Sequence, residues 1–393
     1  MNAKGQICFG TVGAGRATEL HVSALQRYNM SYVHLKTIVG RRFEQVKAVQ
    51  ERFGYEKASL DLDDILKDPE IDVVDICTPP YAHEDTIVKA LNHGKHVICE
   101  KPLCGYFGLP DDPRPIGDKV SKAKMYDKVM DSLESLKDII SSSGKKFMYA
   151  ENFIYAPAVN KAAQIIREKR CRILYAKGEE SLKGSSSPVA GDWSKTGGGT
   201  FLRTGVHPLS AILWLKKQES IARGVNIGIK GVFADMGRVT PSLSEYDHRH
   251  IAANPIDVED NGTVVLTFSD DSKAVVIATD TLLGGSKNVV ELYCNDAAIT
   301  CNLTMSNMMS TYFLDEERLD NVALSEMLPT KTGWNNVFLE DEIIRGYVDE
   351  MKDFVDCIKY NREPRSGLDI AYDVTQITYA AYKSSELGIA VKL

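Results

Sequence analysis

Short apolar runs alternate with segments of helical periodicity through the first part of the chain. Such runs are typical of buried strands, and a strand followed by an amphipathic helix predicts a right-handed crossover onto a parallel sheet. The expected strands are 6–12, 34–39, 73–77, 97–99 and 146–150, and the expected helices cover 20–28, 44–53, 86–91 and 126–141. Residues 1–150 are therefore predicted to form one doubly wound α/β domain.

The remaining residues, 151–393, follow a different pattern. The expected helices are 158–169, 201–215 and 369–387, and the expected strands are 173–181, 262–268, 273–281, 288–293 and 298–303. Asp-Asp-Ser and Asn-Asp turns separate the later strands, which is typical of an antiparallel sheet. We expect a second α/β domain with a large open, mainly antiparallel sheet.

Length, charge and cysteine usage exclude several classes of protein. A chain of 393 residues with 44% hydrophobic residues is long enough for two globular domains, and it contains no apolar run that could span a bilayer. A net charge of -7 argues against a nucleic acid as partner. The eight cysteines form no Cys-x-x-Cys pair, and the first residues contain no signal-peptide core. We expect a cytoplasmic protein without a membrane partner or a metal site.

Two glycines lie between the first expected strand and the first expected helix. In a dinucleotide site, Gly13 would permit the tight turn, and Gly15 would let a pyrophosphate approach the backbone N–H groups of the helix. Thr18 stands where this fingerprint has Gly or Ala, so an ordinary glycine turn is the alternative. The order strand, turn, helix favours the cofactor site.

The second expected strand ends in Val39-Gly40-Arg41-Arg42. In this type of domain an acid at that end contacts the ribose of NAD, whereas basic residues accept the 2′-phosphate of NADP. Arg41 and Arg42 can each make bidentate contacts to a phosphate, and no acid stands at the strand end. The sequence therefore favours NADP over NAD, with solvated arginines at a helix start as the alternative.

A single lysine ends the apolar run at 97–99. Lys101 follows Glu100 and precedes Pro102, which ends the strand there. Because open parallel sheets bind their ligands at the carboxyl ends of the strands, Lys101 is the first candidate for a functional residue. Glu151 should leave the sheet at the same edge, after the strand at 146–150. The Gly- and Pro-rich segment 105–117 is predicted to be a loop, either a lid or a surface or subunit contact.

A second candidate segment surrounds three consecutive glycines, 197–199, before the helix at 201–215. Three glycines indicate a backbone that is mobile or closely approached by other groups. On the predicted helix, Arg203 and His207 are spaced i, i+4 and would project from one face. They would form one wall of a site, although a buried core histidine is an equally good interpretation of His207 alone.

Together these elements resemble the Gfo/Idh/MocA family of pyridine-nucleotide oxidoreductases over nearly the whole chain. The resemblance rests on Gly13-Ala14-Gly15, Thr78-Pro79, His83, Gly94-Lys-His96, Glu100-Lys-Pro102, Asn152, Pro157, Gly197-Gly-Gly199, Gly205, His207 and Arg362-Glu-Pro364. It implies a Rossmann domain, 1–150, and an α/β domain for substrate binding and oligomerisation, 151–393. The family commonly forms homodimers or homotetramers.

The resemblance also implies the roles of the candidate residues. Lys101 is similar to the family lysine that orients the substrate hydroxyl and the nicotinamide, and His207 is similar to the acid/base histidine. Cofactor contacts are expected from Gly13, Ala14, Gly15, Arg16, Arg41, Arg42, Thr78, Pro79, His83, Glu100, Lys101 and Trp193. Substrate contacts are expected from Arg203, Asn152, Glu151, Tyr155 and Lys195.

One position departs from the family pattern. Many members have an aspartate four residues before the histidine, where this chain has Arg203. Either Arg203 binds a carboxylate or phosphate of the substrate, or it forms a structural salt bridge with an acid such as Glu151. The first case implies a sugar acid or sugar phosphate, and the second leaves a neutral sugar, polyol or glycoside.

The predicted activity is hydride transfer between NADP or NAD and a carbinol or carbonyl carbon of a carbohydrate-like molecule. Two other functions stay open at this point. One is a glycosidase that uses nicotinamide to oxidise, eliminate and re-reduce a sugar. The other is a non-enzymatic regulator that binds the dinucleotide, although a sensor would have no need for both Lys101 and His207.

Overall fold

A computed structural model describes residues 5–28, 30–185, 187, 189–304, 309–313, 316, 330, 332–337 and 341–393. The chain divides into two compact units. The first comprises Met1–Tyr106, Asp127–Tyr155 and Gly346–Gln376, and the second comprises Phe107–Tyr126, Ala156–Arg345 and Ile377–Leu393. The sequence pattern did not indicate that residues near the C-terminus return to the first unit.

The first unit contains a six-stranded parallel sheet in the order β3-β2-β1-β4-β5-β6. Its strands are β1 (Ile7–Val12), β2 (Val33–Val39), β3 (Lys57–Ser59), β4 (Val73–Ile76), β5 (His96–Glu100) and β6 (Phe147–Ala150). The strands β1 and β4 are buried along their whole length, as expected of central strands that helices cover on both faces. This strand order is the doubly wound arrangement that the sequence predicted.

The register of this sheet places the ends of five strands at one edge. Val12 pairs with Val39 of β2 and with Ile76 of β4. Ile76 pairs with Cys99 of β5, and the next residue of β5, Glu100, pairs with Ala150 of β6. The glycine turn, Lys101 and Glu151 therefore leave the sheet at the same carboxyl edge, where such sheets bind ligands.

Helices pack around this sheet within the first unit. They are α1 (Arg16–Tyr28), α2 (Phe43–Phe53), α3 (Asp63–Leu66), α4 (His83–Asn92) and α12 (Tyr347–Lys359), with short 3₁₀ turns at η1 (Met30–Tyr32), η2 (Pro80–Ala82) and η3 (Asn152–Tyr155). Two long helices, α6 (Lys122–Ser142) and α13 (Leu368–Leu387), contribute residues to both units. The helix α12 packs against α1, and its buried face includes Met351 and Phe354.

The second unit is built on a seven-stranded mixed sheet in the order β12-β11-β7-β10-β9-β8-β15. Its strands are β7 (Ile173–Leu182), β8 (Ile229–Gly237), β9 (Asn261–Phe268), β10 (Lys273–Thr279), β11 (Ser286–Cys294), β12 (Ala298–Asn302) and β15 (Val391–Lys392). Every neighbouring pair is antiparallel except β7 and β10. A separate antiparallel pair consists of β13 (Met309–Phe313) and β14 (Gly333–Val337). The predicted mainly antiparallel sheet is confirmed.

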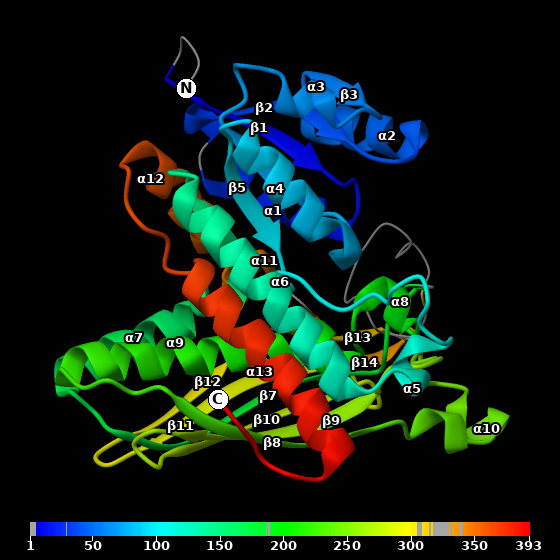
Figure 1. The fold of residues 1–393 in the computed structure, drawn as a ribbon, viewed down its shortest axis with the longest axis vertical. Coiled ribbons are helices and arrows are strands. Elements are labelled where there is room, and N and C mark those ends of the chain that lie inside the picture. Colours follow the sequence, from blue (N-terminus) through cyan, green and yellow to red (C-terminus); the bar gives the residue numbers. More distant parts are fainter. Residues whose placement is uncertain are drawn as a thin grey trace. The chain divides into compact units, whose positions relative to one another are not determined.

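Two helices, α7 (Pro157–Lys169) and α9 (Val206–Arg223), lie side by side over one face of this sheet (Figure 1). The helix α9 contacts β7, β10 and β11. The shorter helices of this unit are α5 (Ile116–Lys119), α8 (Trp193–Thr196), α10 (Glu245–His248), α11 (Asp341–Ile344) and the 3₁₀ turn η5 (Thr240–Ser242). None of the helices in the described part of the chain is both long enough and apolar enough to cross a membrane.

One predicted helix begins differently from the expectation. The segment from Phe201 to Gly205 forms a π-helical turn, η4, before the regular helix α9 starts at Val206. Arg203 lies in this π-helical turn and His207 in the first turn of α9. A π-helical turn contains more residues than an α-helical one, so the i, i+4 spacing does not stack the two side chains as it would on one regular helix.

Candidate active site

The glycine turn after β1 is shaped by close contact with the end of β4. Gly13 has a φ of +114°, and a Cβ there would lie 2.3 Å from the carbonyl oxygen of Cys77. A side chain at Gly15 would meet nothing within 4 Å, so the backbone at the start of α1 is open to a ligand. The hydroxyl of the buried Thr18 donates to the carbonyl oxygen of Gly13 at 2.9 Å. Thr18 therefore stabilises the turn, which accounts for its departure from the usual fingerprint.

This turn fits the pyrophosphate of a dinucleotide. Open backbone N–H groups at the N-terminus of the 13-residue helix α1 would receive the negative charge. The neighbouring side chains lie at the surface: Arg16 is exposed and pairs with Glu19 at 3.3 Å. The carbonyl oxygen of Ala14 accepts a hydrogen bond from Gln45 at 2.7 Å, which ties the turn to α2.

Arg41 and Arg42 follow β2 and are both exposed. Arg42 precedes the first residue of α2, and its guanidinium donates to the side-chain oxygen of Gln45 at 3.0 Å. Gln45 thus links Arg42 to the glycine turn. Both arginines lie at the edge where the adenosine end of a dinucleotide is read in such folds.

Lys101 leaves the sheet directly after β5 and is partly buried. Its backbone N–H donates to the Oε2 atom of Glu100 at 3.1 Å. The other carboxylate oxygen of Glu100, Oε1, lies 3.3 Å from the Nε2 atom of His21 on α1. The Glu100 carboxylate therefore holds the backbone of the turn that carries Lys101.

His83 lies beneath this edge, fully buried. Its Nδ1 atom is 2.7 Å from the carbonyl oxygen of Pro102, and its Nε2 atom is 2.9 Å from that of Thr78. Burial lowers the pKa of His83 more than these two carbonyls raise it. The ring bridges the loops after β4 and β5, so it supports the predicted cofactor wall and does not face it. Pro79 is exposed at the surface of that wall.

Three candidates follow β6. Glu151 and Asn152 are buried, the former completely. Tyr155 is also buried, and its hydroxyl donates to Asp353 at 2.9 Å and accepts from the backbone N–H of Ser366 at 3.0 Å. Because both hydrogen-bonding directions of this hydroxyl are used inside the first unit, its environment argues against the predicted substrate contact.

In the second unit, Trp193 and Lys195 occupy contrasting environments. The Trp193 ring is closed off: the Nζ atom of Lys122 lies 4.3 Å from its centroid, and the Tyr382 ring lies 4.8 Å away. The residue is 1% exposed, which argues against the predicted cofactor contact. Lys195, two residues later on α8, is exposed and available to a ligand.

The three glycines 197–199 are closely approached by neighbouring groups. A Cβ at Gly199 would lie 2.0 Å from the backbone oxygen of Glu259. The buried Glu259 carboxylate accepts hydrogen bonds from the N–H groups of Gly199 and Phe201 at 2.8 and 2.9 Å, and from the Tyr382 hydroxyl at 2.9 Å. Burial raises the pKa of Glu259 to about 7. The sequence left open whether the backbone of these glycines is mobile or closely approached by other groups, and these contacts support close approach.

Arg203 forms an ion pair with Asp280, which follows β10. Asp280 also accepts a hydrogen bond from the Thr200 hydroxyl at 3.0 Å. Burial raises the pKa of Asp280, although the Arg203 guanidinium opposes that shift. The predicted salt-bridge alternative is thus realised, but its partner is Asp280, where the sequence had suggested Glu151.

A cavity of about 290 Å³ lies next to this pair within the second unit. Its walls carry hydroxyl, amide and charged groups together, from Ser185, Ser187, Arg203, Asn254, Glu259 and Asp280. His207, in the first turn of α9, is 8% exposed and is not one of the residues that line this cavity. Donors and acceptors in such a mixture suit a molecule with several hydroxyl groups.

Two family models match this chain. Residues 7–107 match the family model for the oxidoreductase family with an NAD-binding Rossmann fold, and residues 165–300 match the model of the GFO/IDH/MocA C-terminal domain. These two models together cover more than half of the chain. The chain belongs to the Gfo/Idh/MocA family of oxidoreductases. The resemblance inferred from the sequence is confirmed.

Several relatives align over most of their length. Myo-inositol 2-dehydrogenase of Thermotoga maritima is 23% identical over 98% of this chain and 98% of that protein. Levoglucosan dehydrogenase of Pseudarthrobacter phenanthrenivorans is 27% identical over 72% of this chain and 68% of that protein. Among solved structures, GenD2 from gentamicin A biosynthesis, in complex with NAD, has a TM-score of 0.79 at 22% identity, with 99% and 96% of the two chains covered. This structural likeness supports the fold.

Sequence reasoning missed several groups that shape the site. Asp280 and Glu259 lie far along the chain from their partners, and nothing in the local sequence marks them as such. His21 and Asp75 each lie inside apolar segments, and a polar residue within a buried strand or helix face was the available signal. Glu350 is a fully buried acid on α12, a helix that the sequence analysis did not assign.

Proposed function

We propose that this chain transfers a hydride between a nicotinamide dinucleotide and the carbinol or carbonyl carbon of a neutral sugar or polyol. The observation that carries the proposal is the edge of the first unit, where an open glycine turn and Lys101 follow strands in matching register. Membership of the family supports the reaction class. The relatives named above as dehydrogenases of myo-inositol and levoglucosan support the substrate class.

The chain's own residues have separate tasks in this proposal. A nicotinamide, when bound, accepts or gives the hydride, and the protein must manage the proton of the hydroxyl group. We assign to the Lys101 ammonium the stabilisation of developing negative charge on the substrate oxygen. His207 is assigned the transfer of the hydroxyl proton, because imidazole takes up and releases protons near neutral pH. Glu151, Asn152 and Lys195 remain proposed substrate contacts.

The ion pair between Arg203 and Asp280 supports a neutral substrate. The Asp280 carboxylate already compensates the charge of the Arg203 guanidinium, so a second anion would be attracted only weakly. An anionic substrate that took the place of Asp280 would leave that buried acid without a countercharge. Many family members have an aspartate where this chain has Arg203. In this chain, Asp280 offers a carboxylate that could accept a hydrogen bond from a substrate hydroxyl. The pair therefore favours neutral polyols over sugar acids or sugar phosphates.

For the cofactor we propose NADP in preference to NAD. Arg41 and Arg42 are exposed after β2, and the strand end carries no acid to bind the ribose hydroxyls. The ratio of kcat/KM for NADP to that for NAD tests this preference. This ratio should fall by about tenfold or more in an Arg41→Ala, Arg42→Ala double variant, because each substitution removes a charge-assisted contact to the 2′-phosphate.

We further propose a homodimer or homotetramer, as the family resemblance implies. The exposed face of the second unit's sheet is hollowed, with about 650 Å³ lined by residues of β7, β10, β11 and β12 such as Tyr175 and Ile277. Light scattering of the purified protein would give its mass directly. A particle of one chain's mass at micromolar concentration would remove this part of the proposal.

A substrate screen tests the proposed activity. The purified protein would be mixed with NADP or NAD and with myo-inositol, levoglucosan, L-sorbose, glucuronate or a glycoside, and the absorbance of reduced nicotinamide followed. We expect turnover with at least one neutral compound and a much smaller rate with glucuronate. Faster turnover of glucuronate would contradict the assignment of Arg203. Cleavage of the glycoside without net reduced nicotinamide would indicate the glycosidase, and dinucleotide binding with no turnover at all would indicate the regulator.

A further inference from the structure

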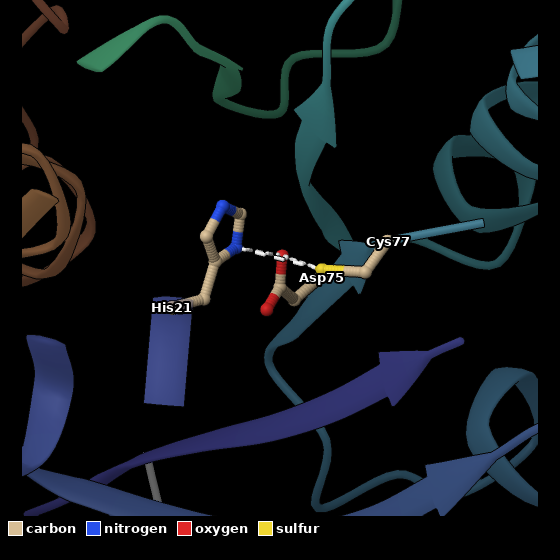
Figure 2. A group of neighbouring side chains, drawn as sticks. All are labelled: His21, Asp75 and Cys77. Carbon is tan, nitrogen blue, oxygen red and sulfur yellow. Dashed lines mark hydrogen bonds and ion pairs between the residues drawn. The ribbon is translucent and has the colours of Figure 1, made fainter. Parts of the chain in front are cut away.

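A buried histidine connects three elements of the first unit behind Lys101. His21 on α1 is fully buried, and its Nδ1 atom lies 3.0 Å from the Oδ1 atom of Asp75 in β4 (Figure 2). On the other side of the ring, Nε2 lies 3.3 Å from the Oε1 atom of Glu100 at the end of β5. The side chains of Asp75 and Glu100 are 1% and 14% exposed. Each ring nitrogen therefore faces a carboxylate.

This arrangement favours a charged ring. An ionised carboxylate only accepts hydrogen bonds, so Nδ1 carries a proton toward Asp75, while Nε2 makes no hydrogen bond to any residue that the structure describes and lies within ion-pair distance of Glu100. Burial by itself lowers the pKa of His21, but Asp75 and Cys77 raise it, and the net result lies well above the ordinary value. An imidazolium between two carboxylates also compensates part of the negative charge buried at this edge.

The same contacts continue to the backbone of Lys101. Glu100 faces His21 with Oε1 and accepts the Lys101 N–H with Oε2 at 3.1 Å. On the far side of the lysine, His83 holds the carbonyl oxygen of Pro102 at 2.7 Å. Lys101 thus sits in a short turn whose backbone is fixed on both sides by buried histidines, one of them acting through Glu100.

We propose that His21, as an imidazolium between Asp75 and Glu100, is a positioning residue that fixes the turn from which Lys101 reaches the substrate. The role rests on the function proposed above for Lys101. It assigns to His21 no contact with substrate or cofactor. Its effect passes through the Glu100 carboxylate, whose two oxygens hold the imidazolium and the lysine backbone at once.

A bound metal ion is the competing interpretation of the same cluster. The ligand atoms of His21, Asp75 and Cys77 all lie within 4.8 Å of one another, and the sulfur is 3.6 Å from both Nδ1 and Oδ1 (Figure 2). Burial raises the pKa of the Cys77 thiol to about 12, so the sulfur keeps its proton and donates it to Asp75. A metal would have to displace the protons of both the thiol and Nδ1 in a fully buried place, so we favour the imidazolium.

Nitrogen NMR tests the charge of His21 without any substrate. Protein labelled with ¹⁵N only in its histidines would be compared with a His21→Gln variant, which identifies the His21 signals, at pH 8 with and without added zinc. We expect both ring nitrogens of His21 to be protonated and insensitive to zinc. A neutral ring, or a shift on adding one equivalent of zinc, would overturn the proposal, and the latter would establish the metal site.

Amide hydrogen exchange tests the positioning role. In His21→Gln and Glu100→Gln, exchange of the Lys101 amide should rise at least tenfold while the amides of β1 and β2 stay protected, because the loss is local to the turn. His34→Gln is the matched control, since His34 forms a solvent-exposed pair with Glu56 at 2.9 Å in the same unit. Equal exchange at Lys101 in His21→Gln and the wild type would contradict the role, and a uniform rise across the sheet would indicate mere loss of stability.

Turnover adds a second readout if the screen yields a substrate. The kcat of His21→Gln should fall by about ten- to a hundredfold with the Kd of the dinucleotide unchanged, and the double variant His21→Gln, Glu100→Gln should be no worse than Glu100→Gln alone. Additive losses would show that His21 acts by another route. If the wild type turns over nothing, the proposed function fails, whereas the exchange and NMR results still decide the structural role of His21.

Discussion

Different interactions determine the positions of the candidate residues around Lys101 in the first unit and around Arg203 in the second unit. At the first edge, strand register alone brings together the ends of β1, β4, β5 and β6. At the second segment, a π-helical turn and an acid from a distant strand end decide where the charge of Arg203 goes. Residues whose position follows from regular hydrogen bonding are predictable from sequence, and residues whose partner is set by tertiary packing are not.

Substitution of Lys101 should have the largest effect and would test the first region. Lys101→Met keeps the length of the side chain and removes the ammonium, so kcat should fall by about a thousandfold, in the range that the loss of one preorganised charge-stabilising group produces. Lys89→Met on the exposed face of α4 is the control and should be neutral. Steady-state rates with the best compound of the screen measure both. A Lys101→Met enzyme with near-normal kcat would remove this edge from the mechanism.

His207→Gln carries the same question to the second region. If the imidazole moves the hydroxyl proton, kcat should fall by about a hundredfold and the limb of the pH–rate profile that reports this proton should flatten. His248→Gln serves as the control, because His248 lies in the short helix α10 and its Nε2 atom is 2.7 Å from the carbonyl oxygen of Ala253. A pH–rate profile that retains both limbs in His207→Gln would assign the proton transfer to another group.

Asp280→Asn should sharpen the comparison through stability and specificity. The variant removes the countercharge of Arg203, whose side chain is 20% exposed, so we expect a loss of about 2 kcal/mol in the free energy of unfolding, below the full penalty for a buried ion pair. The freed guanidinium should also improve the kcat/KM for glucuronate relative to myo-inositol. Denaturant unfolding and the two substrates give the readouts, with Asp271→Asn at an exposed pair as control. An unchanged preference would mean that Arg203 does not face the substrate.

The last prediction concerns the pH dependence of stability that a buried acid behind the first edge produces. Burial and the nearby carboxylates of Glu100 and Glu151 raise the pKa of Glu350 well above its ordinary value. The folded state then binds this proton more tightly, so its stabilising contribution is complete below the unfolded pKa, about 4.3, and is lost as the pH rises toward the folded pKa. The loss approaches about 1.4 kcal/mol for each pH unit in that window.

Glu350→Gln removes this titration and keeps the shape of the protonated acid. We expect the free energy of unfolding of the variant to decline less steeply between pH 5 and pH 8 than that of the wild type. His21 has a raised pKa as well, so a decline above about pH 6.5 should persist in the variant. Parallel pH curves for the two proteins would show that Glu350 stays ionised and that the charged His21 ring compensates it.

The extent of sequence prediction follows the same division. Apolar runs predicted the strands β1, β2, β4, β5 and β6 and their shared edge, because nearly every residue of a buried parallel strand is apolar. The short strand β3 and the helix α12 were missed, although α12 has an apolar face that the periodicity could have revealed. The Arg203–Asp280 pair joins residues 77 positions apart, and no local pattern encodes such a contact.

Two predicted contacts are disfavoured for a related reason. The family resemblance led to the expectation that Tyr155 and Trp193 contact ligands. In the folded chain, Asp353 and Ser366 engage the Tyr155 hydroxyl, and Lys122 with Tyr382 covers the Trp193 ring. Nearness along the chain does not indicate which side of a turn faces solvent, and only the packing of distant segments decides it.

The central proposal is that this chain transfers a hydride between a nicotinamide and a carbinol or carbonyl carbon of a neutral sugar or polyol. The most direct measurement uses a polyol from the screen carrying deuterium on its carbinol carbons, with mass spectrometry of the nicotinamide after a single turnover. We predict one deuterium in the reduced nicotinamide from the wild type and almost none from Lys101→Met in the same time. Oxidised product from the wild type without deuterium in the nicotinamide would contradict the claim.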